Sequence, residues 1–231
     1  MLKFESARFS DRSEAGRQLG ERLKCLRLDR PIVYALPRGG VLVAAEVAAA
    51  LGAPLDLVLV RKLGAPFQPE LAVGAVVDGG EAETVLNQEI VALTGTSEEY
   101  IAAARARELA EIERRRRLYV ADRPRPDPRG RAAVVVDDGL ATGATARAAL
   151  HALRRRGPGR LILAVPVASP DTIAAIRSEA DEVVCLHVEE LYRGIGSFYD
   201  DFHQLTDGEV IRLLDTAAAR DARERKGESG A

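Results

Sequence analysis

Hydrophobic and polar positions alternate in blocks along this chain of 231 residues. Short apolar runs, several of them rich in β-branched residues, are typical of strands buried on both faces of a sheet. We predict such strands at residues 32–36, 55–60, 71–77, 83–86, 133–136, 161–165 and 182–187.

Between these runs lie longer stretches with helical character. Ala15, Leu19 and Leu23 follow the spacing of one helix face, and Gly52 ends an Ala-rich stretch. The alternation of strands and helices predicts an α/β fold, a mostly parallel twisted sheet with helices on both faces. The helices are predicted at residues 13–26, 41–51, 98–119, 146–156 and 171–180.

Other segments break this alternation. Residues 61–70 hold Gly64, Pro66 and Pro69 and predict a loop, and Asp78-Gly79-Gly80 predicts a hairpin. We expect a single domain over residues 1–216, with a helical insertion at about residues 87–128 and a disordered polar tail at residues 217–231.

Composition narrows the classes of partner. The net charge of −2 and the isoelectric point near 6.0 give no general attraction to nucleic acid or to anionic lipid. Cys25 and Cys185 lack metal or redox spacing, which favours reduced thiols in a cytoplasmic protein. The charged N-terminus does not match a signal peptide, and no apolar run reaches the length of a membrane span. A basic run at residues 114–117 follows interleaved glutamates, which favours a solvated helix face over an RNA site.

The most informative chemistry follows the apolar run at residues 133–136. Asp137 and Asp138 stand at the end of this predicted strand, and the Thr142–Thr145 turn precedes a predicted helix. Two adjacent carboxylates can accept hydrogen bonds from sugar hydroxyls or hold a hydrated Mg2+. Backbone N–H groups and hydroxyls at a helix N-terminus favour a phosphate. The segment therefore predicts a site for a phosphorylated sugar.

This segment closely resembles the phosphoribosyl pyrophosphate (PRPP) signature of type I phosphoribosyltransferases. Only Gly139 departs from it, standing where a larger apolar residue is usual. The wider pattern is similar to that of predicted bacterial phosphoribosyltransferases of unknown acceptor, through residues 35–40, 60–64, 87–89 and 198–202. The resemblance covers most of the chain and implies a fold and a donor, but no acceptor.

The resemblance assigns roles residue by residue. Asp137, Asp138, Arg38 and Lys62 would be catalytic, and both acids would hold Mg2+ through water and PRPP. The loop at residues 37–40 and the basic pair at residues 61–62 would meet the pyrophosphate. The complete set implied for PRPP binding is Arg38, Gly39, Gly40, Arg61, Lys62, Asp137, Asp138, Ala141, Thr142, Gly143, Ala144 and Thr145.

The implied reaction transfers ribose 5-phosphate to a nitrogenous acceptor and releases pyrophosphate, as in nucleotide metabolism. Some purine-salvage relatives carry, where Ala141 stands, an aspartate that faces the base. That acid is missing here, and the acceptor stays open. An aromatic C-terminal stretch, within a hood at about residues 188–210, is either the acceptor site or a packed lid. Its candidate acceptor-binding residues are Tyr192, Phe198, Tyr199 and Phe202.

A second class of function, a regulatory protein without catalysis, also stays open. Some proteins of this fold sense PRPP and regulate transcription without turnover. The acidic isoelectric point argues against DNA binding, and the retained acids and basic residues favour turnover. We therefore expect a small-molecule enzyme without membrane or nucleic-acid partners, and we leave open whether it forms a homodimer.

Overall fold

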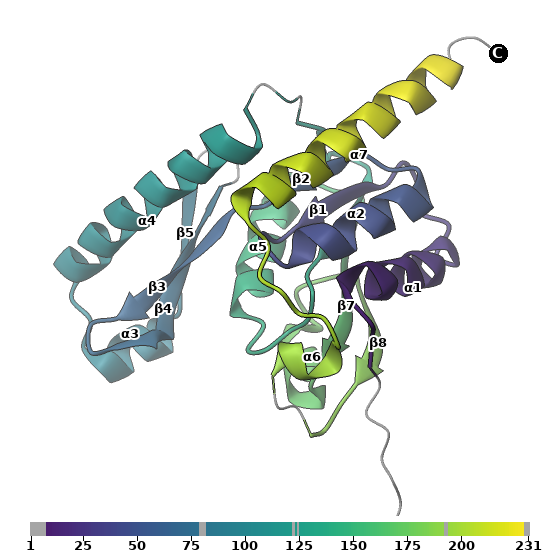
Figure 1. Ribbon diagram of the computed structural model, residues 1–231. Helices are drawn as coiled ribbons and strands as arrows, with labels where there is room; N and C mark the ends of the chain where they lie inside the picture. The colour runs from purple at the N-terminus through teal and green to yellow at the C-terminus, as the bar shows by residue number, and fades with distance from the viewer. Residues whose placement is uncertain (1–7, 79–81, 122, 124, 192–193, 229–231) are drawn as a thin grey trace, which may run out of the picture.

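The computed structural model describes residues 8–78, 82–121, 123, 125–191 and 194–228. Its centre is a five-stranded, fully parallel sheet, and a separate three-stranded antiparallel sheet stands to one side (Figure 1). The parallel sheet has the order β2-β1-β6-β7-β8. Its strands are β1 (Ile32–Ala35), β2 (Leu55–Leu57), β6 (Ala132–Val136), β7 (Arg160–Ala168) and β8 (Glu182–Val188).

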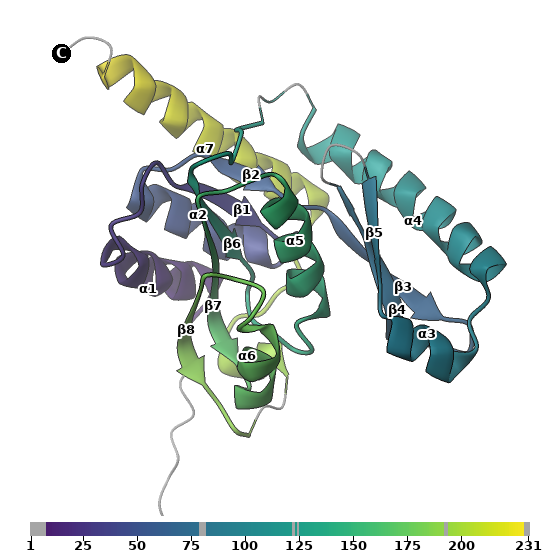
Figure 2. The same ribbon diagram turned by 180° about the vertical axis from the view of Figure 1, so that it is seen from behind.

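Helices cover both faces of this sheet, as predicted. Successive side chains of a strand point to opposite faces. Val134 and Val136 accordingly join the cluster under α1, α2 and α7, whereas Ala133 and Val135 join the cluster under α5 and α6. The first set of helices lies in front in Figure 1, and α5 comes to the front in Figure 2. The bounds are α1 (Arg12–Lys24), α2 (Gly40–Leu51), α5 (Ala144–Arg155), α6 (Pro170–Ile176) and α7 (Asp207–Glu228).

The strand order reverses between β1 and β6. The chain leaves β1 through α2 to reach β2 on one side, while β6 pairs with β1 on the other. In open α/β sheets ligands bind at such a switch point, outside the carboxyl ends of the strands. The loop after β1 and the loop after β6 therefore flank the expected site.

The antiparallel sheet belongs to a lobe that differs from the predicted helical insertion. It begins at β3 (Val60–Ala65), which pairs with β4 (Gln68–Asp78), and the predicted loop at residues 61–70 is instead this hairpin. The pattern is strand-like because Leu63 and Ala65 alternate inward with exposed or half-buried neighbours. The lobe is completed by β5 (Ala82–Leu86), α3 (Gln88–Thr94) and α4 (Glu98–Tyr119).

A charged joint connects the lobe to the parallel sheet. The Arg125 guanidinium lies 3.4 Å from a carboxylate oxygen of Asp56 in β2 and 3.3 Å from one of Asp78 at the end of β4. Both carboxylates are buried. Buried carboxylates need a partner of opposite charge, so Arg125 holds the two sheets together at this point.

The C-terminal segment also differs from the expectation. Residues 217–228, predicted as a disordered tail, continue α7. Val210, Leu214 and Ala217 are buried at helical spacing, and α7 packs against α2 and β2. The prediction was misled by the polar composition of residues 217–231. The buried residues that hold α7 in place lie mostly before this segment.

None of the helices in the described part of the chain combines the length and the apolar character that a membrane span requires.

Candidate functional site

The acidic pair stands where β6 ends, at the switch point of the sheet. The backbone N–H of Asp138 donates to Oδ1 of Asp137 at 2.9 Å. The two side chains line different hollows. Asp137 lines a cavity of about 160 Å³, which we call the turn cavity because the Thr142–Thr145 turn forms its wall. Asp138 lines a cavity of about 460 Å³, which we call the Arg12 cavity.

Both carboxyl groups have raised pKa values. Loss of water contact raises the pKa of Asp137 well above its ordinary value, and the neighbouring charge of Asp138 adds to the rise. Burial also raises the pKa of Asp138, although the Arg12 guanidinium opposes that shift. Two carboxylates at one strand end fit a Mg2+ that keeps several waters and shares substrate phosphates. Among the described residues no larger group of His, Cys, Asp and Glu could hold a metal.

Arg12, which the sequence analysis did not single out, is the partner of Asp138. Its Nε donates to Oδ2 of Asp138 at 2.7 Å, and its Nη1 donates to the carbonyl of His203 at 3.0 Å. Its guanidinium lies 3.6 Å from the centre of the Phe202 ring. Arg12 is 5% exposed. One buried side chain thus joins α1, the acidic pair and the C-terminal segment.

The sequence does indicate that Arg12 is buried. It falls on the same stripe of α1 as Ala15, Leu19 and Leu23, all of which are buried. A charged residue on an apolar stripe implies a buried partner of opposite charge. The sequence could not say which carboxylate that partner is, because Asp138 lies 126 positions away.

The Thr142–Thr145 turn begins α5 as predicted. Gly143 has φ +70° at the N-cap and supplies no side-chain cap, so the N–H groups of the first helical turn remain for a ligand. The N–H of Ala144 makes only a long contact of 3.5 Å with Oγ1 of Thr142. The predicted residues Ala141 to Thr145 all line the turn cavity. This geometry suits an anion.

The loop after β1 packs directly on the acidic pair. A Cβ on Gly39 would lie 2.0 Å from Oδ2 of Asp138, and one on Gly40 would lie 2.9 Å from the carbonyl oxygen of Val136. Only glycine permits this approach. Arg38 lines the Arg12 cavity, 3.8 Å from Oδ1 of Asp207.

The basic pair in β3 is divided by the alternation of the strand. Lys62, predicted to meet the pyrophosphate, lines the turn cavity beside the Thr142–Thr145 turn. Arg61 points away from it, and its Nε donates to Oε2 of Glu108 in α4 at 2.7 Å. The prediction that Arg61 contributes to the site is not matched by this geometry, because neighbouring residues of a strand face opposite sides.

The C-terminal aromatic residues do not act as one group. Phe198 and Tyr199 are buried in a small core with Phe9, so two of the predicted acceptor contacts are packing residues. The Tyr199 hydroxyl donates to the backbone carbonyl of Asp138 at 2.6 Å. Phe202 lines the Arg12 cavity and is 37% exposed. Tyr192 lies outside the described residues.

Gly139, the one departure from the signature, has a local reason. It has φ +157°, and a Cβ there would lie 3.0 Å from the side chains of Ile195 and Val167. Ile195 also lines the turn cavity. The C-terminal segment thus fills the space that a larger residue would occupy.

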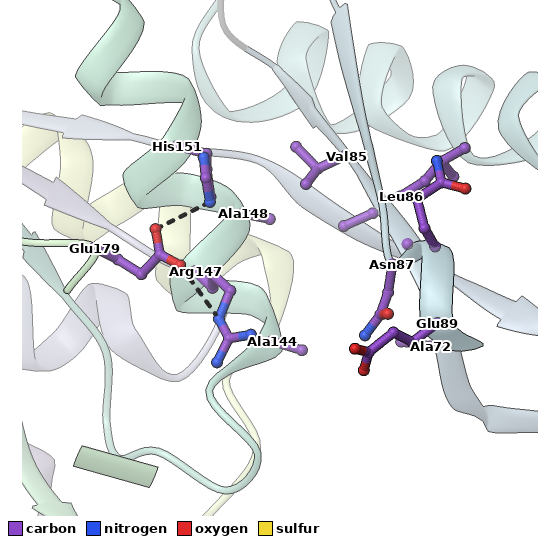
Figure 3. A pocket seen from close by; sticks show the side chains of 13 residues that line it. Ala72, Val85, Leu86, Asn87, Glu89, Ala144, Arg147, Ala148, His151 and Glu179 are labelled. Carbon is purple, nitrogen blue, oxygen red and sulfur yellow. Dashed lines mark ion pairs between the residues drawn. The ribbon is translucent and has the colours of Figure 1, made fainter. Parts of the chain in front are cut away.

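Another cavity, of about 490 Å³, lies between α5 and the antiparallel lobe (Figure 3). On the α5 side Glu179 pairs with Nε2 of His151 at 3.0 Å and with Nε of Arg147 at 3.8 Å. Asn87 and Glu89 face them from the lobe. Ala144 lines both this cavity and the turn cavity, so the two adjoin at the start of α5.

The acidic pair and the turn at the start of α5 lie together at the switch point of the parallel sheet. A comparison with family models shows which family has this arrangement. The model for the phosphoribosyl transferase domain matches residues 16–203. The chain belongs to the phosphoribosyl transferase domain family. The resemblance to this family noted in the sequence is thereby confirmed, and so is the predicted fold class.

Individual relatives agree with this assignment. The chain is 46% identical over 209 residues to a Mycobacterium tuberculosis protein named "Putative phosphoribosyl transferase", covering 90% of this chain and 47% of that protein. The chain therefore spans about half the length of such curated relatives. A uracil phosphoribosyltransferase of Lactobacillus gasseri is 34% identical over 84 residues, covering 32% of this chain and 40% of that enzyme. The crystal structure of the protein TT1426 from Thermus thermophilus is 44% identical with a TM-score of 0.76, covering 90% of this chain and 97% of that one.

Proposed function

We propose that this protein binds PRPP with Mg2+ and transfers its ribose 5-phosphate to a nitrogenous small molecule, releasing pyrophosphate. The observation that carries the proposal is the division of the acidic pair between two cavities. A ribose held at Asp137 and Asp138 has an anion-binding turn on one side and a second, wider cavity on the other.

The turn cavity is proposed to take the 5-phosphate. The free N–H groups at the start of α5 and the hydroxyls of Thr142 and Thr145 would hold its oxygens. Asp137 and Asp138 would accept hydrogen bonds from the ribose hydroxyls. Bound Mg2+ would favour the deprotonated carboxylates, and their negative charge would then favour the positive charge that develops on the ribose ring as the C1–O bond breaks.

The pyrophosphate and the acceptor are assigned to the far side of the pair. Arg38 and Gly39 line the Arg12 cavity there, and Lys62, which lines the turn cavity, would approach from the other side of the acidic pair. These cations would stabilise the departing pyrophosphate, and bound Mg2+ would supply further charge neutralisation near the acids. The remaining wall, formed by Phe202, Gln204 and Leu205, would contact the acceptor.

Thermal unfolding with PRPP and Mg2+ tests the donor assignment. A ligand at 100 times its dissociation constant stabilises the folded state by about 2.7 kcal/mol, so a clear rise in melting temperature is expected. No rise at millimolar PRPP with Mg2+ would contradict the proposal. Ribose 5-phosphate and pyrophosphate, tested separately, show whether the response is specific to the complete donor.

The alternative function is a PRPP sensor of the same fold without turnover. Release of pyrophosphate over a panel of purines, pyrimidines and amines separates the two. Binding of PRPP with no pyrophosphate release from any acceptor favours the sensor. Release that depends on the acceptor establishes the transferase and identifies its substrate class.

A further inference from the structure

A buried arginine stands behind the acidic pair and has no part in the function proposed so far. The ion pair between Arg12 and Asp138 leaves these side chains only 6% and 10% exposed. Placing two charges in so little water is costly unless their geometry is good and their remaining hydrogen-bonding groups are satisfied. The ion pair is therefore expected to serve the groups whose positions it fixes.

The contacts of Arg12 show what is held. Nε reaches Asp138, Nη1 reaches the carbonyl of His203, and the flat guanidinium lies over the Phe202 ring. Asp138 is fixed a second time through its backbone, because the Tyr199 hydroxyl donates to its carbonyl. Arg12 thus holds the side chain of Asp138, and Tyr199 holds its backbone carbonyl.

The loop after β1 depends on the same carboxylate. The position of a Cβ on Gly39 would be 2.0 Å from Oδ2 of Asp138 and 3.3 Å from Nη2 of Arg12. The oxygen that crowds Gly39 is the one that accepts the hydrogen bond from Arg12. A rotation of Asp138 would therefore change the packing of this carboxylate against Gly39, in the loop that is proposed to meet the pyrophosphate.

We propose that Arg12 is a positioning residue for PRPP binding: its guanidinium fixes the Asp138 carboxylate in the orientation that the ribose and the loop at residues 37–40 require. This inference rests on the proposed function, because it presumes that PRPP binds at the acidic pair. It adds a residue from outside the signature and ties the C-terminal segment to the donor side of the site.

A double-mutant cycle with PRPP and Mg2+ tests the inference, with dissociation constants measured by calorimetry. Arg12→Gln is expected to weaken PRPP binding by about tenfold to a hundredfold, the range for one charge-assisted hydrogen bond. Arg12→Lys keeps the charge and should recover most of that loss. Arg17→Gln is the matched control, since Arg17 lies on the same helix and its exposed side chain pairs only at 3.8 Å with Glu46; it should bind PRPP as the wild type does.

The decisive comparison is between Asp138→Asn and the double variant R12Q/D138N. If Arg12 acts through Asp138, the two bind PRPP within about twofold of each other, because effects on one interaction do not add. If the double variant binds PRPP about tenfold or more weakly than Asp138→Asn, Arg12 acts elsewhere and the inference is wrong. This comparison does not need Arg12→Gln alone to fold.

The proposed function and this inference fail in different ways. If the wild-type protein does not bind PRPP, the donor assignment is wrong. If the wild type binds PRPP and Arg12→Gln binds it equally well in a folded protein, the donor assignment stands and the positioning role is refuted.

Discussion

The two sides of the site are built from the chain in opposite ways. The turn cavity owes most of its wall to one continuous segment, residues 139–146, with Lys62 and Ile195 added from elsewhere. The Arg12 cavity is assembled from the start of α1, the loop after β1, the end of β6 and the segment before α7. The residues of the turn cavity can therefore be recognised as one motif in the sequence. Those of the Arg12 cavity come together only when the chain folds.

This difference indicates which of the two cavities can change more easily through substitutions. A continuous turn at a helix start carries its own anion-binding geometry, because backbone N–H groups supply it. A cavity assembled from distant segments changes when any one of them changes. The turn cavity therefore carries most of the family signature in one segment, whereas the Arg12 cavity depends on four separate segments.

The sharpest test of this division compares the two acids. Asp138→Asn removes the buried partner of Arg12 and is expected to destabilise the fold by about 3–5 kcal/mol. Asp137→Asn should not, because an asparagine oxygen at that position can still accept the hydrogen bond from the Asp138 N–H. Chemical denaturation of both variants measures the difference. Equal losses of stability would show that the two acids are not divided between the two sides.

The packing of Ile195 against Gly139 within the turn cavity gives a smaller effect. Gly139→Ala places a methyl group 3.0 Å from Ile195 and Val167 at a backbone φ of +157°. Overpacking of this kind costs about 1–3 kcal/mol. Combining it with Ile195→Ala should recover part of the melting temperature. No recovery would mean that backbone strain, and not the clash with Ile195, sets the cost.

The continuous side should act on PRPP alone. Thr142→Val removes one hydroxyl from the turn and is expected to weaken PRPP binding by about tenfold, since a hydrogen bond to a charged group contributes about 1.5 kcal/mol or more. The melting temperature without ligand should stay unchanged because Thr142 is exposed. Thr216→Val, on α7, is the matched control. Unchanged PRPP affinity in Thr142→Val would remove the turn from the donor site.

The smallest effect is expected at Phe202. Phe202→Leu removes the aromatic face over Arg12, an interaction that contributes about 1 kcal/mol, because Arg12 is buried but Phe202 is 37% exposed. Stability should fall by that amount, while PRPP affinity stays within about twofold of the wild type. If PRPP affinity falls as far as in Arg12→Gln, Phe202 shares in holding Asp138 and does not belong to the acceptor side alone.

Much of the fold was predictable from local patterns. The parallel strands and the helix at residues 98–119 follow from apolar runs and capping residues, which act over a few neighbouring positions. The hairpin of β3 and β4 was missed because Gly64, Pro66 and Pro69 are strong loop signals. Gly64 in fact lets the strands approach, since a Cβ there would lie 2.4 Å from the carbonyl oxygen of Pro69.

The sequence by itself determined the strand, the place of the two acids at its end and the turn before α5, because these features of residues 133–145 depend on neighbouring residues. Only the tertiary structure decided that Arg61 pairs with Glu108, that Phe198 and Tyr199 are core residues, and that Arg12 meets Asp138. The physical reason is that burial and charge pairing depend on which distant segments meet at the sheet edge. A buried arginine such as Arg12 implies a carboxylate partner, but only the fold determines that this partner is Asp138.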